Sequence, residues 1–359
     1  ACEVGTRFRR STVIGRRQEG PDPLPFALPD GVELAALPHY ERLVDLPAVA
    51  RASVGTCREL WRALDRIDVV WVFGPHPFAI LLVGFALARR RRVALGVRQD
   101  TMEYFRARLP SPRWRPVLLP IRALTAIFTG LSRLLPTAAF GAHLVPAGRT
   151  RVPPLELSLA LTREADIPER PPERDYSGPI TLLSVGRIDS EKNPLLLVDA
   201  LAELERRDPG RYRLVWVGSG DLDDAVREHA RALDVERLID FRGYVPFGPE
   251  LLGLYRDAHV FVHVSLTEGT PLVIFEALSV ATAVVATDVG GVSAALDGGL
   301  RGALVPPRDR DALVAAVQGV SEDPERREAR RAAGLVRARE VALEPQAERA
   351  ARYLVTGAP

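Results

Sequence analysis

The sequence predicts an α/β protein built from two Rossmann-like domains, and three observations lead to this prediction. The chain has 359 residues, enough for two domains at roughly 150 residues each. Short apolar runs alternate with amphipathic segments, as in a parallel sheet covered by helices on both faces. Residues 152–179 are rich in proline and charge, which is typical of a linker between the two halves.

The composition is that of an ordinary globular protein, with 47% hydrophobic, 26% charged and 6% aromatic residues. The net charge of +2 gives no reason to expect a nucleic-acid partner. Cys2 and Cys57 form no metal or redox motif, and no metal-ligand cluster stands out. No stretch of about 20 residues is apolar enough to span a bilayer. Two thiols in a chain of this length indicate a reducing compartment, so we expect a cytoplasmic protein.

Charge is distributed unevenly along the chain. Residues 1–150 contain 22 Arg against 12 Asp and Glu, a net +10, whereas the remaining residues carry −8. Four arginines precede the apolar run from Val117: Arg106, Arg108, Arg113 and Arg115. This half would suit an anionic membrane surface, at the inner face of the membrane, or a lipid-linked or phosphorylated acceptor. An alternative explanation of the positive charge is a general enrichment of the chain in arginine, together with docking of this half against the acidic half.

The second half reads as a doubly wound sheet. Six apolar runs are expected strands: Ile180–Val185, Leu214–Val217, Leu238–Phe241, His259–Val264, Ala283–Ala286 and Ala303–Val305. The first helix is predicted to begin with Asn193 as N-cap and Pro194 at the first helical position. Ligands of such sheets bind at the carboxyl ends of the strands, so the loops after the strands are the place to look for chemistry.

The first half is less regular, with strands expected at Ser11–Ile14, Asp68–Phe73 and Val93–Val97. Pro77–Ala88 is predicted to be a buried helix that ends on a basic turn. Residues 1–10 read as the tail of a helix. We therefore expect this domain to lack a strand and a Gly-rich loop ahead of Ser11.

The loop after Val185 carries Gly186, Arg187 and Lys192, and Lys192 is the single lysine of the chain. Two cations next to a helix start, whose free N–H groups favour anions, outline a diphosphate site. A compact, flexible ammonium suits phosphate, which explains one lysine among so many arginines. A solvated turn is the alternative.

The loop after Val264 carries two carboxylates, Glu268 and Glu276, separated by seven residues. Pro271 is expected at the first helical position, which would put Glu276 about two turns into the helix. A charge among apolar neighbours fits a residue that accepts hydrogen bonds from a polyol such as ribose. The alternative is a Glu276 that faces the surface.

Two glycine pairs follow other strands. Gly290 and Gly291 are expected to allow close approach of a ligand. Gly218 and Gly220 lack the third glycine of a dinucleotide fingerprint, so we do not expect a nicotinamide cofactor.

Taken in order, these motifs resemble a known family. The segments V-G-R-x-x-x-x-K-N-P, G-S-G, R-G-Y-V, S-L-T-E-G-T-P-L-V-I-F-E-A, V-V-A-T-D-V-G-G and G-A-L-V-P-P are similar to the nucleotide-sugar domain of retaining glycosyltransferases of family four, glycosyl transferases group 1. The similarity runs from Pro179 to about Val317. It implies the GT-B architecture, in which two Rossmann-like domains face a central cleft.

The resemblance implies the boundaries and the function of each part. We expect an acceptor-side domain over residues 1–150, incomplete at its start, and a linker over 151–178. A nucleotide-sugar-binding domain would cover residues 179–340, and a helix over 341–359 would cross back to the first domain. The activity implied is transfer of a sugar from a nucleotide-diphosphate sugar to an acceptor hydroxyl, with retention and without an essential cofactor or metal.

The resemblance also assigns roles residue by residue. Arg187 and Lys192 would hold the diphosphate, Glu268 would contact the transferred sugar, and these three are the expected catalytic residues. Glu276 would bind the ribose, and Tyr244 would lie beside the base. The remaining expected donor-binding residues are Gly186, Gly269, Thr270, Pro271 and Leu272, and the expected acceptor-side residues are His76 and Asp100.

Departures from the family pattern leave other functions open. The family's glycine and proline after the second glutamate are Ala281 and Ala283 here, and its N-terminal histidine corresponds to Gln99. A non-catalytic nucleotide-sugar-binding subunit or inactive homologue is one alternative. A nucleotide-sugar epimerase of the same fold is another. The acceptor is expected to be a sugar, a lipid-linked molecule or a small molecule.

Overall fold

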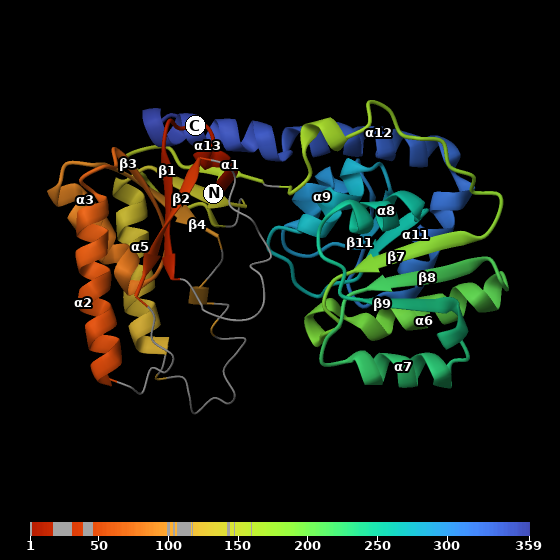
Figure 1. Cartoon of the computed structure of the whole chain (residues 1–359). Helices are drawn as coiled ribbons and strands as arrows, with labels where there is room; N and C mark the ends of the chain where they lie inside the picture. Colours follow the sequence, from red (N-terminus) through yellow and green to blue (C-terminus); the bar gives the residue numbers. More distant parts are fainter. Residues whose placement is uncertain are drawn as a thin grey trace. The chain divides into compact units, whose positions relative to one another are not determined.

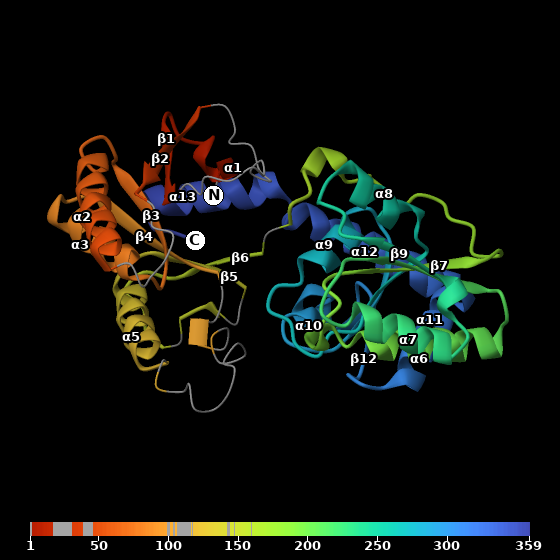
Figure 2. The same cartoon turned by 60° about the horizontal axis from the view of Figure 1, so that its bottom comes forward.

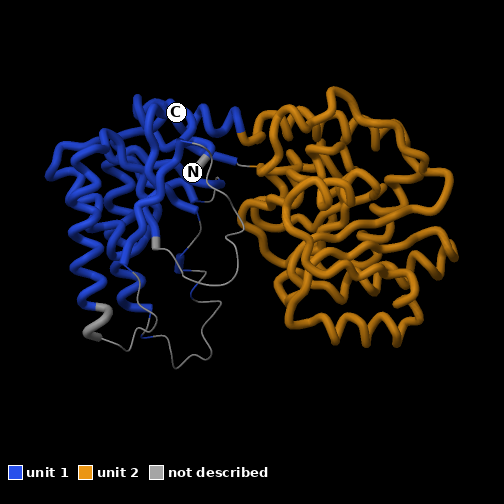
Figure 3. Tube along the Cα trace, viewed as in Figure 1, with its two compact units in different colours: residues 1–158, 344–359 blue, residues 159–343 orange. Residues whose placement is uncertain are grey.

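A computed structural model describes residues 2–16, 31–38, 46–98, 101–102, 105, 116, 118–141, 144–146, 148–158 and 160–359. The chain forms two compact units, which Figure 3 shows in different colours. One unit contains residues 1–158 together with 344–359, and the other contains residues 159–343. Each unit is an α/β structure with parallel strands. The α/β class predicted from the sequence is therefore confirmed.

The second unit is built on a six-stranded parallel sheet (Figure 1). In chain order its strands are β7 (Ile180–Val185), β8 (Tyr212–Val217), β9 (Ile239–Gly243), β10 (Val260–His263), β11 (Ala283–Thr287) and β12 (Ala303–Val305). In space their order is β12-β11-β10-β7-β8-β9. The ends of each of the six predicted runs lie within two residues of the ends of a strand. Strands that are buried on both faces consist of nearly continuous apolar residues, which makes them recognisable in the sequence.

Helices cover both faces of this sheet. Packed on one face are α6 (Pro194–Arg207), α7 (Asp223–Ala232) and α11 (Arg310–Glu322), which bury Leu197, Val226 and Leu313. On the other face lie α8 (Pro249–Asp257), α9 (Leu272–Ser279), α10 (Val292–Ala295) and α12 (Pro324–Glu340), with Ile274 and Leu335 in the core. This two-sided burial is the doubly wound arrangement that the alternating sequence pattern predicts.

In its described residues, the first unit contains two separate parallel sheets. Strands β1 (Ser11–Arg16) and β2 (Val32–Leu37) pair with each other, next to the short α1 (Cys2–Gly5). The second sheet has the order β3-β4-β5-β6, formed by β3 (Val69–Gly74), β4 (Arg92–Val97), β5 (Thr137–Phe140) and β6 (Leu155–Leu157). The described part of residues 1–158 also contains the helices α2 (Leu46–Ala63), α3 (Pro77–Ala88) and α5 (Leu118–Leu134).

The apolar segment Pro77–Ala88 forms a helix with the predicted bounds, but it is buried on one side only. Ala79, Val83 and Ala86 face the core, whereas Leu81 and Leu87 are exposed. None of the helices in the described part of the chain is long and apolar enough to cross a membrane.

The C-terminal helix α13 (Leu343–Thr356) packs on the four-stranded sheet of the first unit, and Figure 2 shows it beside β5 and β6. Tyr353 is completely buried there, and its hydroxyl donates to the carbonyl of Pro153 at 2.8 Å and accepts from the N–H of Thr137 at 2.8 Å. This phenol satisfies two backbone groups near the starts of β5 and β6, so the end of the chain is part of the first unit's core.

Candidate donor site at the switch point of the second sheet

The order of the strands reverses direction at one place in the six-stranded sheet. From β7 the chain moves outward to β8 and β9, and it then returns to β10 and moves the other way to β11 and β12. β7 and β10 are neighbours, so the loops that follow them begin at adjacent strand ends. Such a switch point is where doubly wound sheets bind ligands.

The loop after β7 is shaped by glycines that let backbone pack on backbone. A Cβ at Gly218 would lie 1.9 Å from the carbonyl oxygen of Gly186, and one at Gly220 would lie 2.4 Å from that of Ile188. Gly186 donates its N–H to Val217 at 2.9 Å. The G-S-G turn therefore holds the loop after β7, a role that requires the absence of side chains.

Lys192 ends a short turn whose start is capped. The carboxylate of Asp189 accepts a hydrogen bond from the backbone N–H of Lys192 at 3.2 Å. Pro194 stands at the first position of α6, as predicted. The expectation for Asn193 is wrong in part: it occupies the cap position, but its side chain makes no cap bond, and its φ of 49° is left-handed. Asn tolerates that conformation better than most residues, which explains its presence.

Arg187 is exposed, with 61% of its side chain accessible, and it pairs with carboxylates of its own loop. Its guanidinium lies 3.0 Å from Asp189 and 3.5 Å from Glu191. Exposed pairs of this kind contribute at most about 1 kcal/mol, so exchanging them for an anionic ligand costs little. The side chain is available to a ligand at the switch point.

Glu268 is the centre of the site. The loop after β10 buries its carboxylate, and three side chains donate to the same oxygen, Oε1: His263 Nε2 at 2.8 Å, Ser265 Oγ at 2.8 Å, and Lys192 Nζ. The pKa of Glu268 is lowered to about 2: burial raises it, but the hydrogen bond and charge of His263 and the charge of Lys192 outweigh burial. The cluster joins the loops after β7 and β10.

His263 and Ser265 were not recognised as site residues from the sequence. His263 is the last residue of β10 and is 4% exposed, and Ser265 is fully buried two residues later. The available signal was a histidine in the otherwise apolar run Val260–Val264, where a buried polar side chain needs a partner. Glu268 is that partner.

Glu276 lies inside α9, where it is 5% exposed. The surface-facing alternative is therefore wrong. The hydroxyl of Tyr255 donates to its Oε2 at 2.9 Å, and no described residue donates to Oε1. Burial raises the pKa of Glu276, and the hydrogen bond from Tyr255 offsets part of that effect. α9 begins at Leu272, with Pro271 at the cap, so the expected start is one residue early and Glu276 lies little more than one turn in.

Gly290 and Gly291 make room for the protein's own backbone. A Cβ at Gly290 would lie 1.8 Å from the carbonyl oxygen of Glu268, and one at Gly291 would lie 2.0 Å from that of Gly269. Gly291 also donates its N–H to Glu268 at 3.2 Å. The loop that carries Glu268 therefore packs against both glycines, and the approach of a ligand to them stays a prediction.

The remaining predicted donor-side residues lie in the segments that follow β10 and β9. Gly269, Thr270 and Pro271 connect Glu268 to α9, and Leu272 at the start of that helix is 39% exposed. Tyr244 follows β9 and is 77% exposed. Gly243 beside it has a φ of 66° and accepts from the N–H of Gly218 at 2.7 Å, which links the turn after β9 to the turn after β8.

The two residues predicted for the acceptor side, His76 and Asp100, belong to the first unit. His76 is the N-cap of α3, and its Nδ1 accepts from the N–H of Phe78 at 3.2 Å. This contact gives His76 a structural role and leaves its acceptor role a prediction. Gln99, Asp100, Arg106, Arg108, Arg113 and Arg115 lie outside the described residues.

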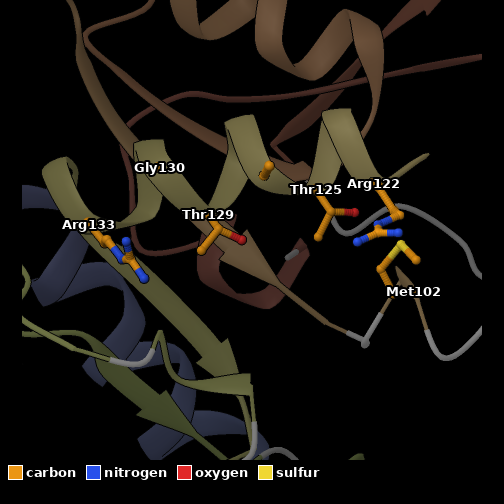
Figure 4. A pocket seen from close by; sticks show the side chains of 7 residues that line it. Met102, Arg122, Thr125, Thr129, Gly130 and Arg133 are labelled. Atoms are coloured by element: carbon orange, nitrogen blue, oxygen red, sulfur yellow. The ribbon is translucent and has the colours of Figure 1, made fainter. Parts of the chain in front are cut away.

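A cavity of about 410 Å³ runs along α5 in the first unit (Figure 4). Its lining residues are Met102, Arg122, Thr125, Ala126, Thr129, Gly130 and Arg133. Figure 4 shows Arg122 and Arg133 at its two ends. Within the described ranges, no three His, Cys, Asp or Glu side chains are grouped so that they could hold a metal ion.

Comparison with known proteins identifies the family of the second unit. The family model described as "Glycosyl transferases group 1" matches residues 167–336, which include the loops after β7 and β10. The chain carries a glycosyl transferases group 1 domain. This domain contains Lys192, Glu268 and Glu276, so the resemblance inferred from the motifs is confirmed.

Curated relatives of the group 1 domain are glycosyltransferases. Glycogen synthase of Mycobacterium tuberculosis is 36% identical over 151 residues, which are 42% of this chain and 36% of that protein. D-inositol 3-phosphate glycosyltransferase of Nocardia farcinica is 42% identical over 128 residues, 34% of this chain and 28% of that protein. The chain thus spans about a third of the length of the curated relatives it matches.

Solved structures share the fold over both units. HepE of Anabaena in complex with UDP has a TM-score of 0.70 at 14% identity and covers 96% of this chain and all of its own. Sucrose-phosphate synthase of Thermosynechococcus elongatus has a TM-score of 0.67 at 19% identity, over 95% of this chain and 87% of that one. The GT-B fold predicted for the chain that carries the group 1 domain is thereby confirmed.

Proposed function

We propose that this protein is a retaining glycosyltransferase that moves a sugar from a nucleotide-diphosphate sugar to an acceptor hydroxyl. The observation that carries the proposal is the contact between Lys192 and Glu268 at the switch point. It joins a cation suited to diphosphate with a carboxylate suited to a sugar, although 76 positions separate them in the chain.

The charges of the site match those that develop during the reaction. As the bond between the sugar and the diphosphate breaks, negative charge grows on the diphosphate and positive charge on the sugar ring. Arg187, Lys192 and the start of α9 near Thr270 would stabilise the leaving diphosphate, and Glu268 would lie on the sugar side. In a retaining reaction the acceptor oxygen bonds to the face of the sugar from which the diphosphate departs.

Donor binding would rearrange the pair that carries the proposal. Lys192 donates to Glu268, and its side chain is only 26% exposed. A diphosphate would attract this ammonium, and Glu268 would then turn to the hydroxyls of the sugar. Glu276, whose Oε1 accepts from no described residue, would take the hydroxyls of the ribose, and Tyr244 would lie beside the base.

The relatives support a sugar donor with a nucleotide. The matched curated proteins are named as a glycogen synthase and as glycosyltransferases, and one structural neighbour holds UDP and glucose. We propose a nucleoside-diphosphate sugar as co-substrate without an essential metal or cofactor. Neither the non-catalytic subunit nor the epimerase is favoured by these relatives.

The first unit would serve the acceptor. We propose that α5 contributes a surface for an anionic membrane or for a phosphorylated or lipid-linked acceptor, at the cytoplasmic face. α5 has no acidic residue, exposes Leu119, Ile127 and Leu134, and lines the cavity with Arg122 and Arg133, neither of which pairs with a described acidic side chain. Apolar side chains flanked by arginines are the pattern of an interfacial helix.

Sedimentation with liposomes tests the membrane proposal. Binding should require anionic lipid and should weaken when Arg122→Glu and Arg133→Glu are combined, whereas Arg170→Glu, an exposed arginine of the second unit, should not change it. Absence of lipid-dependent binding would end the membrane proposal.

Turnover tests the main proposal. The protein is incubated with UDP-, ADP-, GDP- and TDP-sugars, and the products are followed by NMR, which reads the configuration at the anomeric carbon. Release of nucleoside diphosphate with a sugar of retained configuration supports the transferase. Binding without turnover supports the non-catalytic subunit, and an epimerised sugar supports the epimerase.

A further inference from the structure

The carboxylate of Glu268 is held in an unsymmetrical way. His263, Ser265 and Lys192 all donate to Oε1, and no described residue donates to Oε2. A carboxylate has about four acceptor positions, two on each oxygen. One oxygen of Glu268 is therefore fully occupied, and the other is available.

The three donors differ in how firmly they are fixed. Lys192 reaches Glu268 through a flexible four-carbon side chain, and the proposed function gives it a second task on the diphosphate. His263 belongs to strand β10, is 4% exposed, and stacks on Phe261 with ring centroids 6.0 Å apart. Ser265 is fully buried, and its carbonyl accepts from the hydroxyl of Thr287 at 2.6 Å. When Lys192 turns to a phosphate, His263 and Ser265 remain.

The direction of the histidine hydrogen bond is fixed by chemistry. A carboxylate only accepts, so Nε2 of His263 must carry a proton and donate it into the bond with Oε1. No described residue bonds to Nδ1. The histidine thus presents one rigid N–H from the sheet to the carboxylate.

We infer that His263 is a positioning residue of the donor site, which anchors Oε1 of Glu268 so that Oε2 accepts a hydroxyl of the transferred sugar. The inference rests on the proposed function, because it assumes that Glu268 faces that sugar. It distinguishes His263 from the residues that hold the nucleotide: loss of His263 should weaken recognition of the sugar and leave recognition of the nucleoside diphosphate intact.

Isothermal titration calorimetry tests the role of His263 with pairs of ligands. Each pair consists of a nucleoside diphosphate and the matching nucleotide-sugar, such as UDP and UDP-glucose, and the ADP, GDP and TDP pairs are measured in the same way. His263→Leu removes the donor and keeps an apolar side chain of similar size in the buried position. We expect the nucleotide-sugar to bind about 10- to 100-fold more weakly, the effect of losing a hydrogen bond to a charged group, while Kd for the nucleoside diphosphate changes less than about 2-fold.

Two further variants separate positioning from a general structural role. His263→Gln can place an amide N–H near the position of Nε2, so it should restore most of the sugar-dependent affinity. Ser265→Ala removes the second fixed donor and should cause a smaller loss of the same kind. Adding His263→Leu to Glu268→Ala should cost nothing more, because the two residues act as one unit. Unfolding midpoints confirm that each variant is folded.

Each outcome decides the inference. A His263→Leu protein that keeps its affinity for the nucleotide-sugar overturns the role of His263, and so does a parallel loss for both ligands that His263→Gln does not restore. If the unaltered protein binds no nucleoside diphosphate at all, the donor site itself is refuted and the inference falls with it.

Discussion

Gly290 touches the backbone of Glu268 so closely that a Cβ at Gly290 would lie 1.8 Å from the carbonyl oxygen of Glu268. The φ of Gly290 is 51°, which also favours glycine. The loop after β11 thus supports the loop after β10, and the position of the Glu268 carboxylate depends on Gly290.

Replacing Gly290 should therefore damage both stability and ligand binding. Gly290→Ala is expected to lower the free energy of unfolding by roughly 1–3 kcal/mol and to abolish nucleotide-sugar binding, since strained backbone and a clash both displace Glu268. Gly319→Ala is the matched control, because Gly319 lies in α11 with nothing within 4 Å of an added Cβ. It should raise stability by about 0.5–1 kcal/mol. Urea unfolding distinguishes these opposite signs.

Glu268 should stabilise the fold at neutral pH. Its pKa is lowered to about 2 from an ordinary value of 4.5, so its contribution is present above about pH 4.5 and is lost as the pH falls toward about 2. Glu268→Gln should cost up to roughly 3 kcal/mol at pH 7.5, from 1.36 kcal/mol per pKa unit. Urea unfolding at pH 7.5, 4.5 and 3.5 should show the difference shrinking, and a constant or growing difference would contradict the assignment.

Glu276 should behave in the opposite way. Burial raises its pKa, so the folded state holds the proton more tightly, and the stability that this provides is lost as the pH rises through the folded pKa. Glu276→Gln should therefore raise the free energy of unfolding at pH 7.5 while weakening nucleoside-diphosphate binding. Tyr255→Phe, which removes the 2.9 Å bond, should lower stability instead. A Glu276→Gln protein that is less stable than the unaltered protein at pH 7.5 would contradict this prediction. It would mean that the charged carboxylate stabilises the fold despite its burial.

Arg187 should matter for binding and not for stability. Its guanidinium is exposed although Asp189 is only 17% accessible, so Arg187→Ala should change the free energy of unfolding by less than about 1 kcal/mol. Loss of a cation facing a diphosphate should weaken nucleoside-diphosphate binding about 10-fold or more. Arg310→Ala removes another exposed, paired arginine and should leave binding unchanged. Equal affinities for the two variants would remove Arg187 from the site.

The strands and the family were accessible from the sequence because their signals are local. Ile180–Val185 and Ala303–Val305 have the predicted bounds, since buried parallel strands read as continuous apolar runs. Pro194 located the start of α6 because proline fits that position. The start of α9 predicted from Pro271 is one residue too early, because Pro271 is the N-cap of α9 and Leu272 is its first residue.

The contacts within the site were not accessible in the same way. Lys192 meets Glu268 only because β7 and β10 are neighbours, and strand order is a long-range property. His263 was read as part of an apolar run, although its side chain reaches Glu268. A glycine pattern also does not say whether a ligand or protein backbone comes close, so the contact of Gly290 and Gly291 with the loop that carries Glu268 could not be predicted.

Thermal unfolding with nucleoside diphosphates tests the central claim, that Lys192 and Glu268 form a donor site. The midpoint is measured with UDP, GDP, ADP and TDP for the unaltered protein and for Lys192→Ala. One nucleotide should raise the midpoint of the unaltered protein and have little effect on the variant. At a nucleotide concentration of 100 times Kd, binding should stabilise the folded state by about 2.7 kcal/mol. No shift with any of the four, or an equal shift in both proteins, would contradict the claim.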